Sequence, residues 1–266
     1  SPPSTNGDST NQTANGNGKA ANGGSTNGNG HANGNGGGDD KLFMYCAAGM
    51  TLPVEAATKN FESETGASVQ LQFGGSGTLL SNVEVAKRGD LYLAADISYI
   101  KIAREKGLLV EALPLARFKP VIAVQKGNPK NIQSVKDLLR EDVTFAIANP
   151  GAASIGKVTK KVLTKTGEWE QIEAAVKVTK ATVNDIATDI ALGTVDAGIV
   201  WDAIVKQSSD KLEMVTTEPF DAAEKEITAG VLKTCKNPSV ALKYLRYLQA
   251  PDKGQVEFGR YGYKLI

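Results

Sequence analysis

Nine residues, Phe73–Ser81 (FGGSGTLLS), combine the residue types of a small-anion site. Glycines let the backbone adopt conformations closed to other residues and let a ligand approach it closely. A serine or threonine at the start of a following helix supplies a cap and a hydroxyl group. Because the first N–H groups of a helix are unpaired and lie at the positive end of its dipole, the segment predicts a pocket for an anion.

Catalytic and metal-binding side chains are scarce in the rest of the chain. His31 is the only histidine and lies in a polar N-terminal tail, which argues against Ser-His-Asp, Cys-His and His-based metal chemistry. The two cysteines, Cys46 and Cys235, are too few and too far apart in sequence for a zinc cluster. We therefore expect no catalytic residues and no cofactor.

The N-terminal tail, residues 1–40, contains no Val, Ile, Leu, Met or aromatic residue. Such a segment cannot bury enough apolar surface to offset its ordering entropy, so we expect a disordered Gly/Asn/Ser tether. Two explanations stay open for it: the tether of an exported, anchored protein, or a chain cut within a linker.

Charge and hydropathy exclude two classes of partner contact. The net charge is +1 and no basic cluster is present, which argues against nucleic-acid binding. No run of about 18 apolar residues occurs, so no membrane-spanning helix is expected.

Strands alternating with helices must position the Phe73–Ser81 segment. In the first half we expect strands over 41–46, 68–73 and 91–95, with helices over 54–65, 77–87 and 98–106. In the second half we expect strands over 120–126, 143–148, 196–200, 213–217 and 227–234, with helices over 154–166, 183–192, 238–249 and 251–260. This alternation predicts α/β lobes with parallel strands and right-handed crossovers.

Six motifs in series carry a family resemblance: CAAGMTLP, QFGGSGTL, GDLYLAAD, PVIAVQKGNPKNIQSVKDL, ANPGAASIGK and GTVDAGIVWDA. Over residues 41–266 the chain resembles the molybdate/tungstate-binding proteins of ABC importers, which are type II periplasmic solute-binding proteins. The resemblance implies an α/β fold of two lobes, each a mainly parallel sheet flanked by helices, joined by two hinge crossovers. It implies lobe I at 41–119 plus 226–266, lobe II at 120–225, and crossovers near 117–120 and 221–226.

The same resemblance implies the function. The protein would be an extracytoplasmic or periplasmic monomer that captures a small oxyanion between the lobes and delivers it to an ABC permease in the membrane. Its N-terminal tether would anchor it, and the only metal would be one within a bound oxyanion such as molybdate or tungstate. Backbone N–H groups and hydroxyls suit a fully ionised oxyanion because they are directed donors with a lower desolvation cost than lysines.

The family motifs also imply the site residues. The family's first-loop serine falls at Gly49, which keeps the N–H but loses the hydroxyl, and the family's tyrosine falls at Trp201, whose indole N–H is a different donor. Ser76 keeps the second hydroxyl, and the polar residues Ser154 and Asp202 lie nearby in sequence. The predicted ligand-binding set is Gly49, Met50, Gly75, Ser76, Gly77, Ser154, Ile155, Val183, Asn184, Trp201 and Asp202.

Other interpretations of these residues stay open. Ser76 is alternatively a plain helix cap, Trp201 a core aromatic, and Asp202 a solvated or capping carboxylate. Asp96 is expected to cap the helix that follows it. In the family's first-lobe sheet the strands that end at the two cysteines are separated by LYLAA and run in opposite directions, so we expect two free, mostly buried thiols.

Three functions other than transport are compatible with this fold: another binding role, catalysis and transcriptional regulation. The same fold serves sensors and anion scavengers, and other members bind different solutes. An enzyme on this scaffold would have to use Asp96, Asp202 or scattered lysines, which form no convincing pair. A transcription-factor effector domain shares the fold, but the tail lacks a helix-turn-helix pattern.

Overall fold

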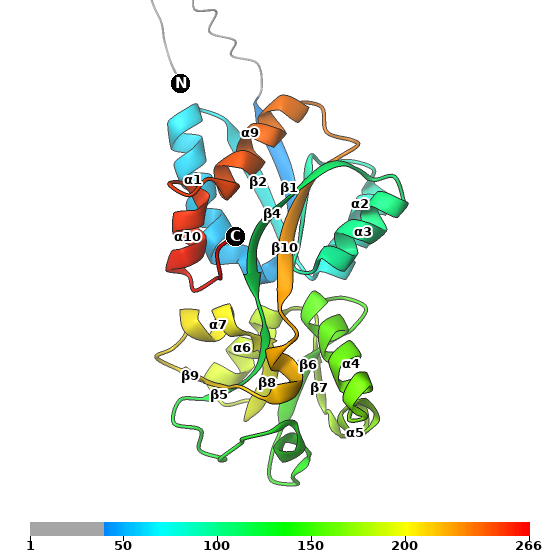
Figure 1. Cartoon of the computed structure of the whole chain (residues 1–266), viewed down its shortest axis with the longest axis vertical. Coiled ribbons are helices and arrows are strands. Elements are labelled where there is room, and N and C mark those ends of the chain that lie inside the picture. Colours follow the sequence, from blue (N-terminus) through cyan, green and yellow to red (C-terminus); the bar gives the residue numbers. More distant parts are fainter. Residues whose placement is uncertain (1–39) are drawn as a thin grey trace, which may run out of the picture. The chain divides into compact units, whose positions relative to one another are not determined.

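The computed structural model describes residues 40–266, which contain two five-stranded sheets (Figure 1). We call the sheet β2-β1-β3-β10-β4 with its helices lobe I, and the sheet β7-β6-β8-β5-β9 with its helices lobe II. This arrangement confirms the predicted two-lobed α/β fold. The predicted tether falls outside the described residues except for Asp40, whose carbonyl oxygen accepts a hydrogen bond from the Ser68 N–H at 2.9 Å.

The lobe I sheet is mixed. Strand β1 pairs in parallel with β2 and β3, whereas β10 runs antiparallel to both β3 and β4. The chain therefore enters lobe I as a parallel βαβ array and closes it with a returning antiparallel strand. The strands are β1 (Lys41–Ala47), β2 (Ser68–Gly74), β3 (Leu91–Ala94), β4 (Leu109–Phe118) and β10 (Lys225–Leu232).

Helices cover both faces of the lobe I sheet, because successive strand residues point to opposite sides. In β1, Met44 and Cys46 belong to one buried cluster, whereas Tyr45 belongs to the other. Helices α1, α9 and α10 lie on one side in Figure 1, and α2 and α3 lie on the other. The helices are α1 (Thr51–Thr65), α2 (Ser76–Ala86), α3 (Ile97–Glu105), α9 (Pro238–Gln249) and α10 (Gly254–Arg260), with a 3-10 turn η1 (Ala48–Met50).

The last two helices return to lobe I, as the sequence predicts. The hydroxyls of Thr58 in α1 and Tyr244 in α9 share a buried hydrogen bond of 2.6 Å. Phe61 lies edge-on to the Tyr244 ring, with 5.0 Å between ring centroids. These contacts join the two ends of the described chain in one core.

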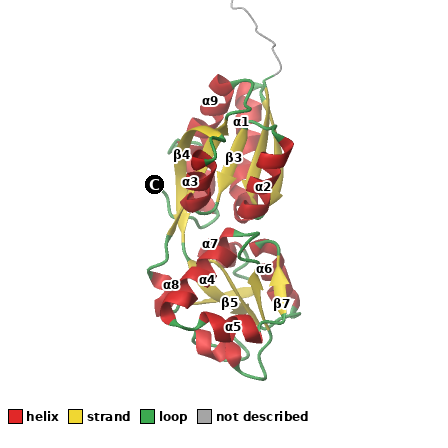
Figure 2. Ribbon diagram, turned by 90° about the vertical axis from the view of Figure 1, so that its right-hand side faces the viewer, coloured by secondary structure: helices red, strands yellow, loops and turns green. Residues whose placement is uncertain are grey.

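Lobe II repeats the pairing pattern of lobe I, with two parallel pairs followed by two antiparallel pairs. Strand β6 is parallel to β7 and β8, and β5 is antiparallel to β8 and β9. Figure 2 shows helices flanking the strands of each sheet. The strands are β5 (Pro120–Gln125), β6 (Phe145–Ala148), β7 (Val178–Lys180), β8 (Ala197–Trp201) and β9 (Leu212–Val215). The helices are α4 (Ser154–Thr166), α5 (Trp169–Ala175), α6 (Val183–Leu192), α7 (Asp202–Gln207) and α8 (Glu218–Asp221), with a 3-10 turn η2 (Val135–Leu139).

Two adjacent crossovers join the lobes. Only Lys119 separates β4 from β5, and the return passes from α8 into β10. The Lys119 N–H donates to the Asp202 carboxylate at 3.0 Å, and the Asp202 N–H donates to the Lys119 carbonyl at 2.9 Å. This reciprocal pair fixes the first residue of α7 against the hinge.

Several element predictions are wrong in extent or missing. Helix α1 begins at Thr51 instead of Val54, and α10 begins at Gly254 instead of Pro251. Strand β4 was not predicted, because Pro114 interrupts its pattern; it is an edge strand, where a proline is tolerated. The structure accommodates Pro114 where the register of β4 against β10 shifts, between Ile227 and Thr228. Strand β7 and helices α5, α7 and α8 were also not predicted.

Both cysteines are free, which confirms the predicted absence of a disulfide. Strand β3 separates β1 from β10, and these two strands run in opposite directions. Cys46 is buried, but Cys235 is only half-buried, so the expectation of a mostly buried pair holds for one of the two thiols. Burial raises the pKa of the Cys46 thiol, and burial raises the pKa of Cys235 to about 11.

None of the helices within residues 40–266 is both long and apolar enough to cross a membrane.

Candidate functional site

A small cavity of about 20 Å³ lies between the two lobes. Lobe I reaches it through the residues that follow β1, β2 and β3, which all lie at the carboxyl ends of strands. Lobe II reaches it through the starts of α4 and α6 and the last residue of β8. The lining consists of Ala47, Ala48, Gly49, Gly74, Gly75, Ser76, Ala95, Ala153, Ser154, Ile155, Thr182, Val183 and Trp201. We call this space the small cavity.

The structure brings seven of the eleven predicted ligand-binding residues together around the small cavity. Those seven are Gly49, Gly75, Ser76, Ser154, Ile155, Val183 and Trp201. Their contact with a ligand stays a prediction. Met50, Gly77, Asn184 and Asp202 do not line it.

Ser76 occupies the lobe I side of the small cavity and is 1% exposed. Its Oγ accepts hydrogen bonds from the Ala95 N–H at 3.2 Å and from the Ser154 hydroxyl, across the lobes, at 2.8 Å. A hydroxyl has two acceptor lone pairs and one donor proton. Because both lone pairs are used, the Ser76 proton is left to donate to an acceptor in the cavity.

The alternative interpretation of Ser76 as a helix cap is wrong. The cap position of α2 is Gly75, and no side chain caps that helix. Ser76 is the first helical residue, and its carbonyl accepts a hydrogen bond from the Tyr92 hydroxyl at 2.7 Å. The Ser76 hydroxyl therefore lies at the small cavity, bonded to Ala95 and Ser154, and does not cap α2.

The N-terminus of α2 faces lobe II directly. The N–H groups of Gly77 and Thr78 donate to the Ala152 carbonyl at 2.9 and 3.2 Å. A Cβ added at Gly77 would lie 2.2 Å from the Gly151 carbonyl oxygen, and one at Gly75 would lie 2.2 Å from the Ala152 carbonyl oxygen. Glycine is therefore required at both positions for the lobes to approach this closely. The Gly77 N–H, predicted to face a ligand, instead binds the opposite lobe.

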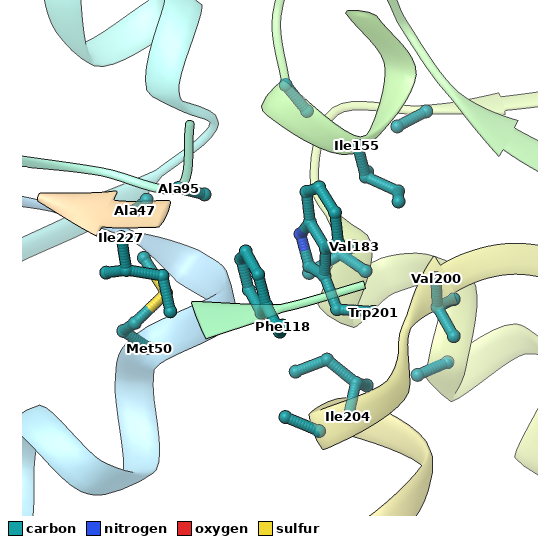
Figure 3. Close-up of a cluster of buried hydrophobic side chains, with 14 of the residues drawn as sticks. Ala47, Met50, Ala95, Phe118, Ile155, Val183, Val200, Trp201, Ile204 and Ile227 are labelled. Carbon is teal, nitrogen blue, oxygen red and sulfur yellow. The ribbon is translucent and has the colours of Figure 1, made fainter. Parts of the chain in front are cut away.

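Trp201 lines the small cavity and is also a buried aromatic, 1% exposed. Its ring stacks on Phe118 with centroids 4.0 Å apart and planes 12° apart (Figure 3). A Cβ added at Gly49 would lie 3.4 Å from Trp201 Cδ1 and 3.8 Å from Nε1. A Cβ at Gly49 would thus be in ordinary van der Waals contact with the indole edge.

Two backbone N–H groups of lobe II are available at the small cavity. Ile155 is the second residue of α4 and Val183 is the first residue of α6. First-turn N–H groups have no acceptor within their own helix. Within the described residues neither N–H has an acceptor outside its helix. The capping box between Thr182 and Asp185 fixes the start of α6, and hence the Val183 N–H.

Two of the predicted residues that do not line the small cavity, Met50 and Asn184, contact other parts of the protein. Met50 is fully buried in the core near Ala47 and Ile227 (Figure 3). Asn184 donates from Nδ2 to the Ala48 carbonyl across the lobes at 3.0 Å, while its buried Oδ1 has no partner among the described residues.

Asp202 lies at the hinge instead of in the small cavity. Besides the Lys119 N–H, its carboxylate binds the Lys206 ammonium at 2.9 Å. The interpretation of Asp202 as a carboxylate with a structural role therefore fits better than ligand contact. Asp96 caps α3 as expected, since its side chain accepts a hydrogen bond from the Ser98 N–H at 2.8 Å.

None of the described residues that line the small cavity has a charged side chain, so the polar groups named there are neutral. Within residues 40–266, His, Cys, Asp and Glu form no group of three or more that could hold a metal ion. The cavity can therefore recognise a ligand by directed N–H and O–H donors, and it has no lining side chain that titrates near neutral pH.

Comparison with known proteins gives consistent matches. The sequence model of a family described as bacterial extracellular solute-binding proteins matches residues 42–264. A Haemophilus influenzae protein named only as a binding protein is 29% identical over 211 residues, 79% of this chain and 86% of that protein. Escherichia coli K12 molybdate-binding protein ModA is 26% identical over 240 residues, 85% of this chain and 90% of that protein. The solved Azotobacter vinelandii periplasmic molybdate-binding protein has a TM-score of 0.73 at 19% identity, covering 85% of this chain and 99% of that chain, which shows the fold.

Proposed function

We propose that this chain, which belongs to the family of bacterial extracellular solute-binding proteins, captures a small, fully ionised oxyanion of the molybdate or tungstate type between its lobes. It would act outside the cytoplasm as a monomer and deliver the ion to an ABC permease in the membrane. Lobe I would comprise residues 41–119 and 226–266, lobe II residues 120–225, and residues 1–40 the tether. The relatives named for molybdate support this choice of ligand.

The observation that carries the proposal is the hydrogen-bonding state of Ser76. Its hydroxyl accepts from Ala95 and Ser154, so it can only donate to a ligand. The N–H groups of Ile155 and Val183 can also only donate. A site built from donors favours an ion whose oxygens carry no proton, because a protonated oxygen would face a donor without an acceptor.

The size of the small cavity excludes large solutes. A water molecule needs roughly 10–15 Å³ of the same kind of volume, and the cavity offers about 20 Å³. In this closed arrangement a sugar or a vitamin would not fit. Trp201 forms one wall of this space.

Contacts between the lobes connect binding with closure. Ser154 binds Ser76, Gly77 binds Ala152 and Asn184 binds Ala48, each pairing one lobe with the other. A ligand that touches donors from both lobes prefers the closed form and shifts the population toward it. A permease could then distinguish loaded from empty receptor.

Isothermal titration calorimetry with molybdate, tungstate, sulfate and phosphate tests the proposal. We expect molybdate and tungstate to bind one per chain, with phosphate weaker because it carries a proton near neutral pH. At 100 times its dissociation constant, a ligand should add about 2.7 kcal/mol to the free energy of unfolding.

A pair of leucine variants provides the control for the same titration. Gly49→Leu should abolish binding by filling the small cavity, whereas Val85→Leu, on the exposed side of α2, should bind normally. Binding of a small organic solute by the unmodified protein, with no heat from any of the four oxyanions, would show that the ligand class is wrong.

A further inference from the structure

A second cavity, of about 190 Å³, is lined by four lysines and by residues that follow some of those lining the small cavity in sequence. Lys101 comes from α3 of lobe I, Lys225 begins β10, and Lys157 and Lys161 lie one turn apart on α4 of lobe II. Asp96 is the only acidic residue in its lining. We call this space the lysine cavity.

The charges in the lysine cavity are poorly balanced. None of the four lysines forms an ion pair with a carboxylate within the described residues. Asp96 offsets one of the four positive charges at most, and one of its oxygens already accepts the Ser98 N–H. Four charges less one leaves a surplus of three, although the whole chain carries a net charge of only +1.

The lysine cavity bridges the two lobes. Lys157 donates from its ammonium to the Ser98 hydroxyl of lobe I at 3.0 Å and lies over the Tyr99 ring, 4.4 Å from the centroid. These contacts hold one lysine in place, whereas Lys101 and Lys161 are exposed to solvent. The site therefore combines one fixed positive charge with charges that solvent reaches.

Residues that line the two cavities lie close together in sequence at two places. Ala95 lines the small cavity and Asp96 lines the lysine cavity. On α4, Ser154 and Ile155 line the small cavity, and Lys157 begins the lining of the lysine cavity within the same turn. Positive charge is thus concentrated beside neutral donors, at one edge of the junction between the lobes.

We propose that Lys101, Lys157, Lys161 and Lys225 form a transient anion site that collects the oxyanion from solvent and passes it to the small cavity. This proposal rests on the proposed oxyanion function. Exposed ammonium groups hold an ion weakly because water screens them. Clustered charge of one sign nevertheless raises the local concentration of the opposite ion and accelerates its association. The lysines would therefore set the rate of capture, and the neutral donors would set the affinity.

Stopped-flow fluorescence with molybdate provides the test, with Trp201 as the reporter at the small cavity. The full chain carrying Trp169→Phe removes the only other tryptophan signal. The test variant combines Lys101→Gln, Lys161→Gln and Lys225→Gln and keeps Lys157, which joins the lobes. The matched control combines Lys59→Gln, Lys136→Gln and Lys243→Gln, three exposed lysines that do not line the lysine cavity and make no ion pair within the described residues.

At an ionic strength of about 10 mM, where charges act over roughly 30 Å, the association rate constant of the test variant should fall by about tenfold. At about 1 M, where the range is roughly 3 Å, the difference should shrink to less than about twofold. The dissociation rate constant should not change. The association rate constant of the control variant should fall by less than about twofold at either ionic strength. That variant removes the same net charge, but away from the lysine cavity.

Three results would overturn the proposal, and only the last of them would also refute the proposed oxyanion function. Equal losses in the test and control variants would refute the lysine site and leave the oxyanion function intact. A change mainly in the dissociation rate constant would show that the lysines hold the bound ion instead of collecting it. Absence of calorimetric binding of any oxyanion to the unmodified protein would refute both the function and this site.

Discussion

Lobe I reaches the small cavity with glycine-rich loops, whereas lobe II reaches it with the first turns of two helices. On the lobe I side, Gly75 and Gly77 let the backbone of α2 touch a carbonyl of the opposite lobe, and Ser76 supplies one hydroxyl. On the lobe II side, Ile155 and Val183 supply N–H groups. Lobe I therefore controls how closely the lobes approach, and lobe II supplies most of the fixed donors.

The aromatic residues divide between the lobes in the same way. All seven tyrosines lie in elements of lobe I or in the segment after α10, and both tryptophans lie in lobe II. Tyrosine absorbance and tryptophan fluorescence thus report on different lobes of one chain. The four predictions below test the difference between the lobes, from the largest expected effect on binding to the smallest, and the last one uses these two signals.

Gly77→Ala should have the largest effect on binding. The new Cβ would meet the Gly151 carbonyl at 2.2 Å, so the lobes cannot reach the closed arrangement. Apparent affinity falls in proportion to the population of the closed form, and we expect a loss of at least about 100-fold. Because alanine favours a helix over glycine by about 1 kcal/mol, lobe I itself should not become less stable.

Calorimetry and a thermal melt of the same Gly77→Ala sample separate these effects. Ser81→Ala, one turn along α2 on an exposed position, is the control and should bind normally. Unchanged affinity in Gly77→Ala would show that closure does not need this contact.

Ser76→Ala should weaken oxyanion binding by about 10- to 100-fold, because a hydrogen bond to a charged group contributes about 1.5–3 kcal/mol. The change also leaves the Ala95 N–H and the Ser154 hydroxyl without their acceptor. Calorimetric titration measures the loss. If Ser76→Ala bound as tightly as the unmodified protein, the donor role assigned to lobe I would be incorrect.

Ser154→Ala should have a smaller effect, about fivefold, since it removes one neutral hydrogen bond worth about 1 kcal/mol. Ser154 orients the Ser76 hydroxyl from the opposite lobe, so its loss lets that hydroxyl accept as well as donate. We therefore expect the preference for molybdate over protonated phosphate to narrow, measured as the ratio of their dissociation constants. Ser154→Thr keeps the hydroxyl and should restore the ratio; failure to do so would contradict the positioning role.

The smallest effect expected on binding is that of pH. Within residues 40–266 no titratable side chain lines the small cavity, so affinity for molybdate should stay constant between pH 6 and 9. The free energy of unfolding, in contrast, should depend on pH in the alkaline range. Burial raises the pKa of Tyr92, Tyr244 and Tyr263 above the ordinary value. Burial also raises the pKa of Tyr99 to about 12.

A raised pKa in the folded state means that these phenols favour folding while protonated. Their contribution is complete below the unfolded pKa of about 10 and is lost as pH rises above it. At pH 11 each such tyrosine should cost about 1.4 kcal/mol of unfolding free energy. As pH rises, tyrosine absorbance should therefore report the unfolding of lobe I. This change should come before, or together with, the change in tryptophan fluorescence from lobe II. An earlier change in tryptophan fluorescence would contradict the division between the lobes.

Much of the fold follows from local sequence rules. The helices over 154–166, 183–192 and 238–249 have the predicted bounds, because glycines end the first two and proline begins the third. The sequence also predicts that the residues after several strands meet at one place, since parallel strands end at a common edge. Strand β4 escaped prediction because its proline breaks the local pattern, and only pairing with β10 defines it.

The sequence by itself determined most strand ends and helix starts, through periodicity and glycine positions, and the family resemblance supplied the residues expected at the cavity. Only the tertiary structure decided what each residue does there. Gly77 binds the Ala152 carbonyl and Ser154 binds Ser76, 78 positions away, although no residue type marks either partner. The physical reason is that every residue carries a backbone carbonyl, so which carbonyl meets which N–H depends on how the two lobes pack.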